Sequence, residues 1–225
     1  MSVQRRGPEP LDIPLRRIRE IQRILLTWGR NNYADFPWRN TANPFHALIA
    51  EIMLQRTRAE QVVPVYIEFV QKYPDFKNAL DENPDKIIEL ISRLGLNWRA
   101  KKVIELLDAL SETDGKIPEK KGELIQLPGV GDYIANAFLS LHKGVRAPIT
   151  DSNAVRIWSR VIGFETDGEL RRRKWFTELC LQLTPDEEFR DFNYAVLDFC
   201  RTICKSRPMC KKCPLNTLCK YFMQK

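Results

Sequence analysis

Four cysteines near the end of the 225-residue sequence have the spacing of a metal-binding cluster. The gaps between them are five, two and five residues, in the order Cys204, Cys210, Cys213 and Cys219. Loops this short let four thiolates turn toward one centre at a small closure cost. A zinc ion or a [4Fe–4S] cluster can take four thiolates, and the single Cys-x-x-Cys pair favours the cluster over zinc ribbons, which use two such pairs. Cys180 and Cys200 lie in apolar helical patterns, which predicts buried core thiols.

Two carboxyl groups are candidates for acid–base chemistry. Asp151 opens the sequence Asp-Ser-Asn at the expected start of a helix, so it is a candidate catalytic carboxylate or a plain helix N-cap. Glu51 lies in a mostly apolar helical segment, where partial burial would keep a proton available. The alternative for Glu51 is an exposed glutamate on a helix face.

A glycine turn, Leu127-Pro128-Gly129-Val130-Gly131, lies between two short apolar segments. Glycines allow backbone angles that other residues disfavour, and the N–H groups at the start of the following helix form a seat for an anion. The net charge of +7 and the pI of about 9.1 favour a polyanionic partner, so the expected anion is a nucleic-acid phosphate. The alternative is an ordinary corner between two helices.

The secondary structure that carries these candidate residues is predicted to be helical. Apolar residues recur with helical spacing, and no segment shows the alternation of a half-buried strand. The hydrophobic content of 44% excludes a disordered chain, and the absence of a signal peptide and of a membrane-spanning run predicts an intracellular protein. We therefore expect an all-α protein, with a helix opening at Asp151 and others over residues 15–28, 45–56, 58–72, 84–94, 98–110, 122–127, 133–141, 170–183 and 190–203.

Taken together, these motifs resemble those of the helix-hairpin-helix DNA glycosylase superfamily with an iron–sulfur cluster, the endonuclease III relatives. The resemblance covers the chain from Leu15 to Cys219. Three further motifs are similar to those of its mismatch-specific branch, which holds the MutY-type adenine glycosylases and the archaeal thymine glycosylases: Asp35-Phe36-Pro37-Trp38-Arg39, Glu51-Ile52-Met53-Leu54-Gln55-Arg56-Thr57 and Asp191-Phe192-Asn193. One departure concerns the first two cluster cysteines, which the family usually separates by six residues and this chain by five.

The resemblance implies two helical domains. A six-helix barrel with the helix-hairpin-helix would span residues 41–151. Residues 1–40 and 152–225 would together form a second domain that carries the [4Fe–4S] cluster, with the active site in the cleft between the two domains.

The resemblance also implies a role for each candidate residue. Asp151 matches the catalytic aspartate and would stabilise the positive charge that develops on the sugar. Glu51 would protonate a purine leaving group or orient water. Tyr133 stands where bifunctional relatives carry a lysine, and a phenol cannot form the Schiff base that strand cleavage needs. Arg56, with Gln55 beside it, matches the wedge that fills the gap left by a flipped base, and the hairpin would contact DNA through Leu127, Gly129, Val130 and Gly131.

These roles predict a monofunctional glycosylase that removes thymine, and uracil, opposite guanine in double-stranded DNA. Arg56 favours this reading, because adenine glycosylases carry glutamine there, and so does the chain's end shortly after Cys219. The first alternative is adenine removal opposite 8-oxoguanine or guanine, which Gln55 favours. A bifunctional glycosylase for oxidised pyrimidines and a non-catalytic DNA-binding protein are further alternatives. The resemblance implies a monomer, and we expect it in the cytoplasm at the nucleoid and not at a membrane.

Overall fold

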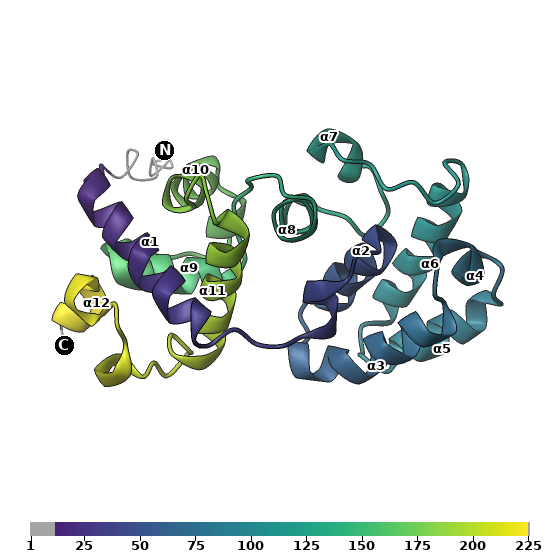
Figure 1. Ribbon diagram of the computed structural model, residues 1–225, viewed down its shortest axis with the longest axis horizontal. Coiled ribbons are helices and arrows are strands. Elements are labelled where there is room, and N and C mark those ends of the chain that lie inside the picture. Colours follow the sequence, from purple (N-terminus) through teal and green to yellow (C-terminus); the bar gives the residue numbers. More distant parts are fainter. Residues whose placement is uncertain (1–11, 225) are drawn as a thin grey trace, which may run out of the picture. The chain divides into compact units, whose positions relative to one another are not determined.

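The computed structural model describes residues 12–224, and within that range its regular elements are all helices (Figure 1). Residues 1–11 and 225, which belong to the predicted terminal pieces, lie outside the described residues. The α-helices are α1 (Leu15–Arg30), α2 (Pro44–Met53), α3 (Ala59–Lys72), α4 (Phe76–Leu80), α5 (Pro84–Ser92), α6 (Asn97–Ser111), α7 (Lys121–Leu124), α8 (Asp132–His142), α9 (Ser152–Trp158), α10 (Lys174–Leu183), α11 (Phe189–Thr202) and α12 (Lys220–Met223). The described residues also form four short 3₁₀-helices, η1 (Pro37–Asn40), η3 (Leu170–Arg172), η4 (Cys210–Lys212) and η5 (Asn216–Leu218), and one π-helical turn, η2 (Ser159–Gly163). No described helix is long and apolar enough to cross a membrane.

The described part of the chain divides into two compact units. Unit 1 takes residues 12–34 and 146–224, and unit 2 takes residues 35–145. The boundaries expected after residues 40 and 151 each lie six residues later than this division. Packing explains both differences. Trp38 stacks on Phe36 and meets Tyr66 of α3 edge-on, which places it in unit 2, whereas Arg146 binds carbonyls at the end of α10 in unit 1.

Unit 1 is built around α1 and α11, which pack along each other (Figure 1). The buried face of α1 repeats at helical spacing through Ile18, Ile21 and Leu25. Trp158 of α9 and Phe192 of α11 extend the same core. Cys180 and Cys200 are buried in this core, as the sequence predicts, and burial raises the pKa of both thiols.

Unit 2 has α2 at its centre, in contact with α8, α3, α6 and η1. All residues from Phe45 to Met53 are buried, including two that can ionise, His46 and Glu51. A helix that is apolar on nearly every side needs protein around it, and the surrounding helices supply that cover. Asn43 caps the helix by accepting a hydrogen bond from the Phe45 N–H at 3.0 Å, as the Asn-Pro pair predicts.

The observed helices differ from the predicted ones in several places. The segment predicted to run to Arg56 ends at Met53, because Arg56 has a positive φ of 55° that no α-helix tolerates. The region after Lys72 contains an additional short helix, α4, which Asp75 caps by accepting from the Asn78 N–H. The predicted helix over 170–183 is split at Arg173, whose extended backbone separates η3 from α10.

Candidate active site

Asp151 lies in unit 1 and is fixed as the N-cap of α9. Its Oδ1 accepts the Ala154 N–H at 2.8 Å, and its Oδ2 accepts a hydrogen bond from the Asn153 side-chain amide. Burial raises the pKa of the Asp151 carboxyl group, while these donors and the nearby Arg156 charge act in the opposite direction. The structure thus joins the two readings of the sequence: Asp151 is an N-cap, and the cap holds a largely desolvated carboxyl group in one orientation.

A chain of hydrogen bonds runs from Asp151 to the cysteine tail. The Asn153 Oδ1 accepts from Arg156 Nη2 at 2.7 Å. The same guanidinium donates through Nε to the Cys204 carbonyl at 2.8 Å and through Nη2 to the Cys200 carbonyl at 3.2 Å. Arg156 therefore holds the amide that orients Asp151 and also the start of the tail.

The segment that leads into Asp151 is anchored on its other side by α10 and α11. Asn193 donates from its side-chain amide to the Ala147 carbonyl at 3.1 Å and is buried, which gives the Asp-Phe-Asn motif a structural role. Arg146 Nη2 donates to the Leu181 carbonyl at 2.7 Å. These contacts restrict the backbone directly before the carboxyl group, so Asp151 is held from both sides.

Glu51 lies in unit 2 and is buried, as its apolar neighbours predict. Its Oε1 lies 3.2 Å from the Nε2 of His142, in the last turn of α8, and each side chain is only 3% exposed. The reading of Glu51 as an exposed glutamate on a helix face is therefore wrong. A buried carboxyl group with a ring nitrogen as its partner can hold or accept a proton.

The glycine turn has the geometry of a hairpin between α7 and α8. Gly129 has a φ of +80°, and a Cβ there would lie 3.2 Å from the Cβ of Lys102, so both backbone conformation and space call for glycine. Gly131, the N-cap of α8, has a φ of −98°, and a Cβ there would meet nothing within 4 Å. Neither strain nor crowding within the protein explains Gly131, which leaves the start of α8 open to a close approach from outside.

The residues that follow α2 lie against this hairpin. Gln55 donates from its side-chain amide to the Gly129 carbonyl at 3.1 Å, which joins the two segments. Arg56 is exposed, with its backbone in the left-handed region. Leu127 is partly buried and its carbonyl accepts the Val130 N–H at 3.1 Å, while the Val130 side chain belongs to the core. Tyr133 is partly buried in the first turn of α8.

A buried arginine that the sequence does not single out supports the same region. Arg99 of α6 has no exposed surface, and its guanidinium donates to the Met53 carbonyl and, at 2.8 Å, to Thr57 Oγ1. Its charge lies at the C-terminal end of α2, where the helix dipole is negative. Arg99 thus holds both ends of the turn that carries Gln55 and Arg56.

The four tail cysteines are near enough to one another to interact electrostatically. Burial raises the pKa of Cys213 to about 11, and the other three thiols act on it in the same direction. Backbone N–H groups donate to the sulfurs, from Leu215 to Cys213 and from Tyr221 and Phe222 to Cys219. Among residues 12–224, no group of three or more His, Cys, Asp or Glu side chains is arranged around a single metal ion.

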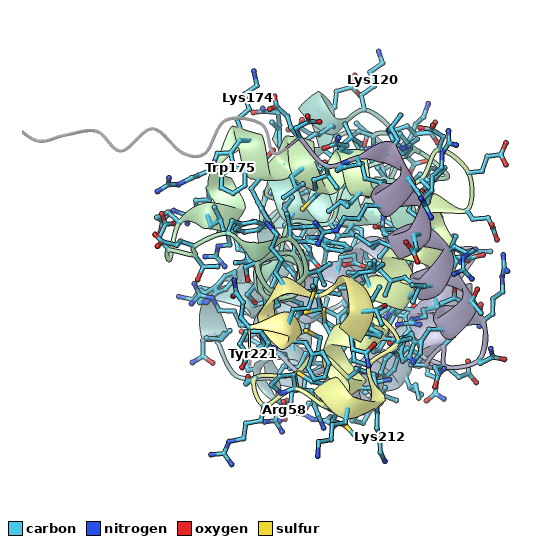
Figure 2. The ribbon with its side chains drawn as sticks, turned by 90° about the vertical axis from the view of Figure 1, so that its left-hand side faces the viewer. Arg58, Lys120, Lys174, Trp175, Lys212 and Tyr221 are labelled. Carbon is cyan, nitrogen blue, oxygen red and sulfur yellow. The ribbon has the colours of Figure 1, made fainter. Side chains whose placement is uncertain are left out.

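Arg160 holds the same tail from η2. It donates to the sulfur of Cys204 at 3.5 Å and to the Ser206 carbonyl at 3.0 Å, and it lies over the ring of Tyr221. Figure 2 shows Tyr221 against the C-terminal ribbon and Lys212 pointing outward from it. Cys204 and Cys219 are buried, and the guanidinium and N–H donors beside them are of the kind that stabilise a thiolate.

Comparison with known proteins decides the family. The family described as "HhH-GPD superfamily base excision DNA repair protein" matches residues 49–181, more than half of the chain. The chain belongs to this HhH-GPD superfamily. It is 39% identical over 213 residues to a thymine-DNA glycosylase of Aeropyrum pernix, covering 92% of this chain and 96% of that one. It is 36% identical over 201 residues to a thymine/uracil-DNA glycosylase of Methanothermobacter thermautotrophicus, covering 88% of this chain and 91% of the other.

A solved structure agrees with the sequence comparison. A thermostable thymine-DNA glycosylase superposes with a TM-score of 0.86 at 33% identity, over 93% of this chain and 98% of that chain. The all-helical fold predicted from the sequence is confirmed. The HhH-GPD superfamily also has members that contain an iron–sulfur cluster.

The residues predicted for the HhH-GPD site fall into two groups. Unit 1 holds Asp151 with the tail cysteines, and unit 2 holds the others, namely Glu51, Gln55, Arg56, Leu127, Gly129, Val130, Gly131 and Tyr133. Sequence reasoning missed His142, Arg99 and the roles of Asn153 and Arg156. Each of these acts through a contact with a distant residue or through its burial, and only the Asp-Ser-Asn-x-x-Arg pattern gave any local signal.

Proposed function

We propose that this protein is a monofunctional DNA glycosylase that removes thymine, and uracil, mispaired with guanine. The observation that carries the proposal is the Asp151 carboxyl group, which the Ala154 N–H and the Asn153 amide hold in a single orientation. A fixed carboxylate is what the cleavage of a glycosidic bond requires, because positive charge develops on the sugar. The near-full-length similarity to thymine and thymine/uracil glycosylases supports the choice of base.

In the proposed reaction, the C1′–N1 bond of the flipped nucleotide breaks and its electron pair leaves with the base. Asp151 stabilises the positive charge on the sugar while the oxygen of a water molecule bonds to C1′. The proton that this water loses passes to the Glu51 carboxylate, which later releases it to solvent, and the departing base anion takes up a proton from solvent. Water and the mismatched nucleotide are thereby converted to free thymine and an intact abasic site.

Tyr133 supports the monofunctional assignment. Strand cleavage by β-elimination needs an amine that forms a Schiff base with C1′, and the phenol at this position cannot form one. We propose that Tyr133 contacts the sugar instead, from its partly buried place in the first turn of α8. The abasic strand would then remain unbroken until it meets alkali.

Binding to DNA is proposed to use the hairpin and Arg56. Gly131 leaves the start of α8 open, and this position suits a phosphate. Arg56 is exposed and its turn is held by Arg99, so it suits the wedge that enters the gap left by the flipped base. We further propose that the protein acts as a monomer on mismatched double-stranded DNA at the nucleoid.

The four tail cysteines, Cys204, Cys210, Cys213 and Cys219, are proposed to hold a [4Fe–4S] cluster. Such a group would cross-link the tail, which consists of short turns and has few buried apolar residues of its own. Iron and sulfide analysis of the purified protein tests this, with Cys210→Ser as the variant and Cys200→Ala as the matched control. Four irons per chain that only Cys210→Ser loses would support the cluster, and zinc in the wild type would refute it.

Removal of adenine is the second candidate, because Gln55 resembles the adenine branch and adenine DNA glycosylases also match this chain, at lower identity. In the structure, however, the Gln55 amide binds the Gly129 carbonyl, so it has a role in holding the hairpin whichever base is removed.

A single-turnover assay distinguishes the candidates. End-labelled duplexes carrying G:T, G:U, 8-oxoguanine:A, G:A or thymine glycol are incubated with excess protein and analysed with and without alkali. We expect release from G:T and G:U, with strand breaks only after alkali. Release from the adenine duplexes alone would establish the second candidate. Strand breaks without alkali would contradict the monofunctional assignment.

A further inference from the structure

The chain contains two histidines, and both side chains are buried within unit 2. His46 lies on α2 itself, with its Nε2 2.8 Å from the Tyr73 carbonyl, which gives it a structural contact. His142 comes from α8 and has the Glu51 carboxyl group as its partner, 3.2 Å away. Glu51 and His142 are separated by 91 positions in the sequence, so only the packing of α8 on α2 brings them together.

Several other ionisable side chains on the elements packed against α2 have contacts of their own. On α6, Arg99 donates to the Met53 carbonyl and to Thr57. On α3, Tyr66 meets Trp38 edge-on, and on η1 Arg39 lies over the ring of Phe36. Tyr133 lies in the first turn of α8, at the other end of the helix from His142. Within unit 2, His142 supplies a side-chain contact to the Glu51 carboxyl group, at 3.2 Å.

We propose that His142 donates its Nε2–H to Glu51 Oε1 and so keeps Glu51 as an oriented carboxylate. This inference rests on the proposed function and gives Glu51 its role within it. A carboxylate with 3% exposure has lost its water, and a ring N–H replaces the donor that water supplied. A hydrogen bond to the charged form favours that form over the carboxylic acid.

The protonation state decides what Glu51 can do in the reaction. An ionised Glu51 accepts the proton of the attacking water and cannot donate one to the leaving base. Thymine and uracil leave as stabilised anions and need no general acid, whereas adenine departs more readily when it is protonated. His142 thus acts as a positioning residue that favours pyrimidine release.

Two variants separate the hydrogen bond from packing. His142→Gln keeps a side-chain N–H donor and loses the ring, whereas His142→Phe keeps a ring of similar size and loses the donor. If His142 acts through its hydrogen bond, His142→Phe slows single-turnover release from G:T by about tenfold to a hundredfold, a part of the 10²–10⁴ typical of acid–base groups. His142→Gln should stay within a few-fold of the wild type, and both variants should bind the duplex with an unchanged Kd. A His142→Phe variant as active as His142→Gln would overturn the proposal.

Nitrogen NMR of the imidazole rings tests the proposal without any activity. With two histidines in the chain, the signals of His46 serve as an internal control. We expect a protonated Nε2 in His142, with shifts that change in Glu51→Gln while those of His46 do not. An unprotonated Nε2 would overturn the proposal and indicate a Glu51 carboxylic acid that donates to the ring. If the wild type releases no base from any duplex, the proposed function fails, while the NMR result still decides the inference.

Discussion

Replacing Asp151 by asparagine should separate catalysis from folding. Asparagine has nearly the same shape, and its Oδ1 can still accept the Ala154 N–H that now ends on Asp151 at 2.8 Å. It lacks the negative charge that would stabilise the sugar cation. Loss of one preorganised electrostatic group typically slows a reaction by about 10²–10³. We therefore expect Asp151→Asn to bind mismatched DNA as the wild type does and to release thymine at least that much more slowly.

The stability of the same variant follows from the pKa of Asp151. Burial raises this pKa above the ordinary 3.8, so the folded protein binds a proton that the unfolded chain has already lost. Stability therefore falls as the pH rises from the unfolded value through the folded one, and the full cost remains at neutral pH. Asp151→Asn avoids this cost, although its amide NH2 loses the hydrogen bond that Oδ2 accepts from Asn153. The melting temperature of Asp151→Asn relative to that of the wild type should therefore rise between pH 3 and pH 7.

Alanine at the same position supplies the matched control. Neither Asp151→Asn nor Asp151→Ala carries the charge, and only asparagine can cap α9. Loss of an N-cap costs about 1 kcal/mol, which corresponds to about 2–4 °C in a chain of this size. Calorimetry should show Asp151→Ala melting lower than Asp151→Asn by this amount, with both equally inactive in the release assay. A wild-type rate for Asp151→Asn, or a melting-temperature difference from the wild type that is the same at pH 3 and at pH 7, would contradict this role of the Asp151 charge.

Three further substitutions test other parts of the site. Tyr133→Lys introduces an amine in the first turn of α8 and should produce strand breaks without alkali, together with a borohydride-trapped protein–DNA adduct that the wild type does not form. Arg156→Gln loses the contacts that join Asn153 to the Cys200 and Cys204 carbonyls, so we expect slower thymine release together with a lower iron content. Arg99→Met leaves the buried Met53 carbonyl without its donor and should lower the free energy of unfolding by about 1–3 kcal/mol, measured by thermal unfolding. As the control, Arg93→Met breaks an exposed ion pair with Glu68 and should lower it by at most about 1 kcal/mol.

The sequence predicts best those features that depend on neighbouring residues. Helical periodicity locates most helices, and the Asn-Pro pair before α2 gives its start correctly. The end of α2 was missed because Arg56 adopts a positive φ that its residue type does not announce. The division into units depends on long-range contacts, such as those of Arg146 with the end of α10, which no local pattern announces.

The same limit applies to the site. Asp151 could be recognised because its motif and its helix start are contiguous. His142 could not be found, because its role comes from a residue 91 positions away. Arg99 begins α6 in a polar stretch that predicts exposure, and only the packing of α6 on α2 buries it.

The most direct test of the central claim is the identity of the released product. Wild-type protein in excess over a G:T duplex is followed by mass spectrometry of the free base and of the intact strands. We expect free thymine, an abasic strand of unchanged length and no release from Asp151→Asn on the same timescale. No thymine from G:T, or a cleaved strand that accompanies its release, would contradict the assignment of a monofunctional thymine glycosylase.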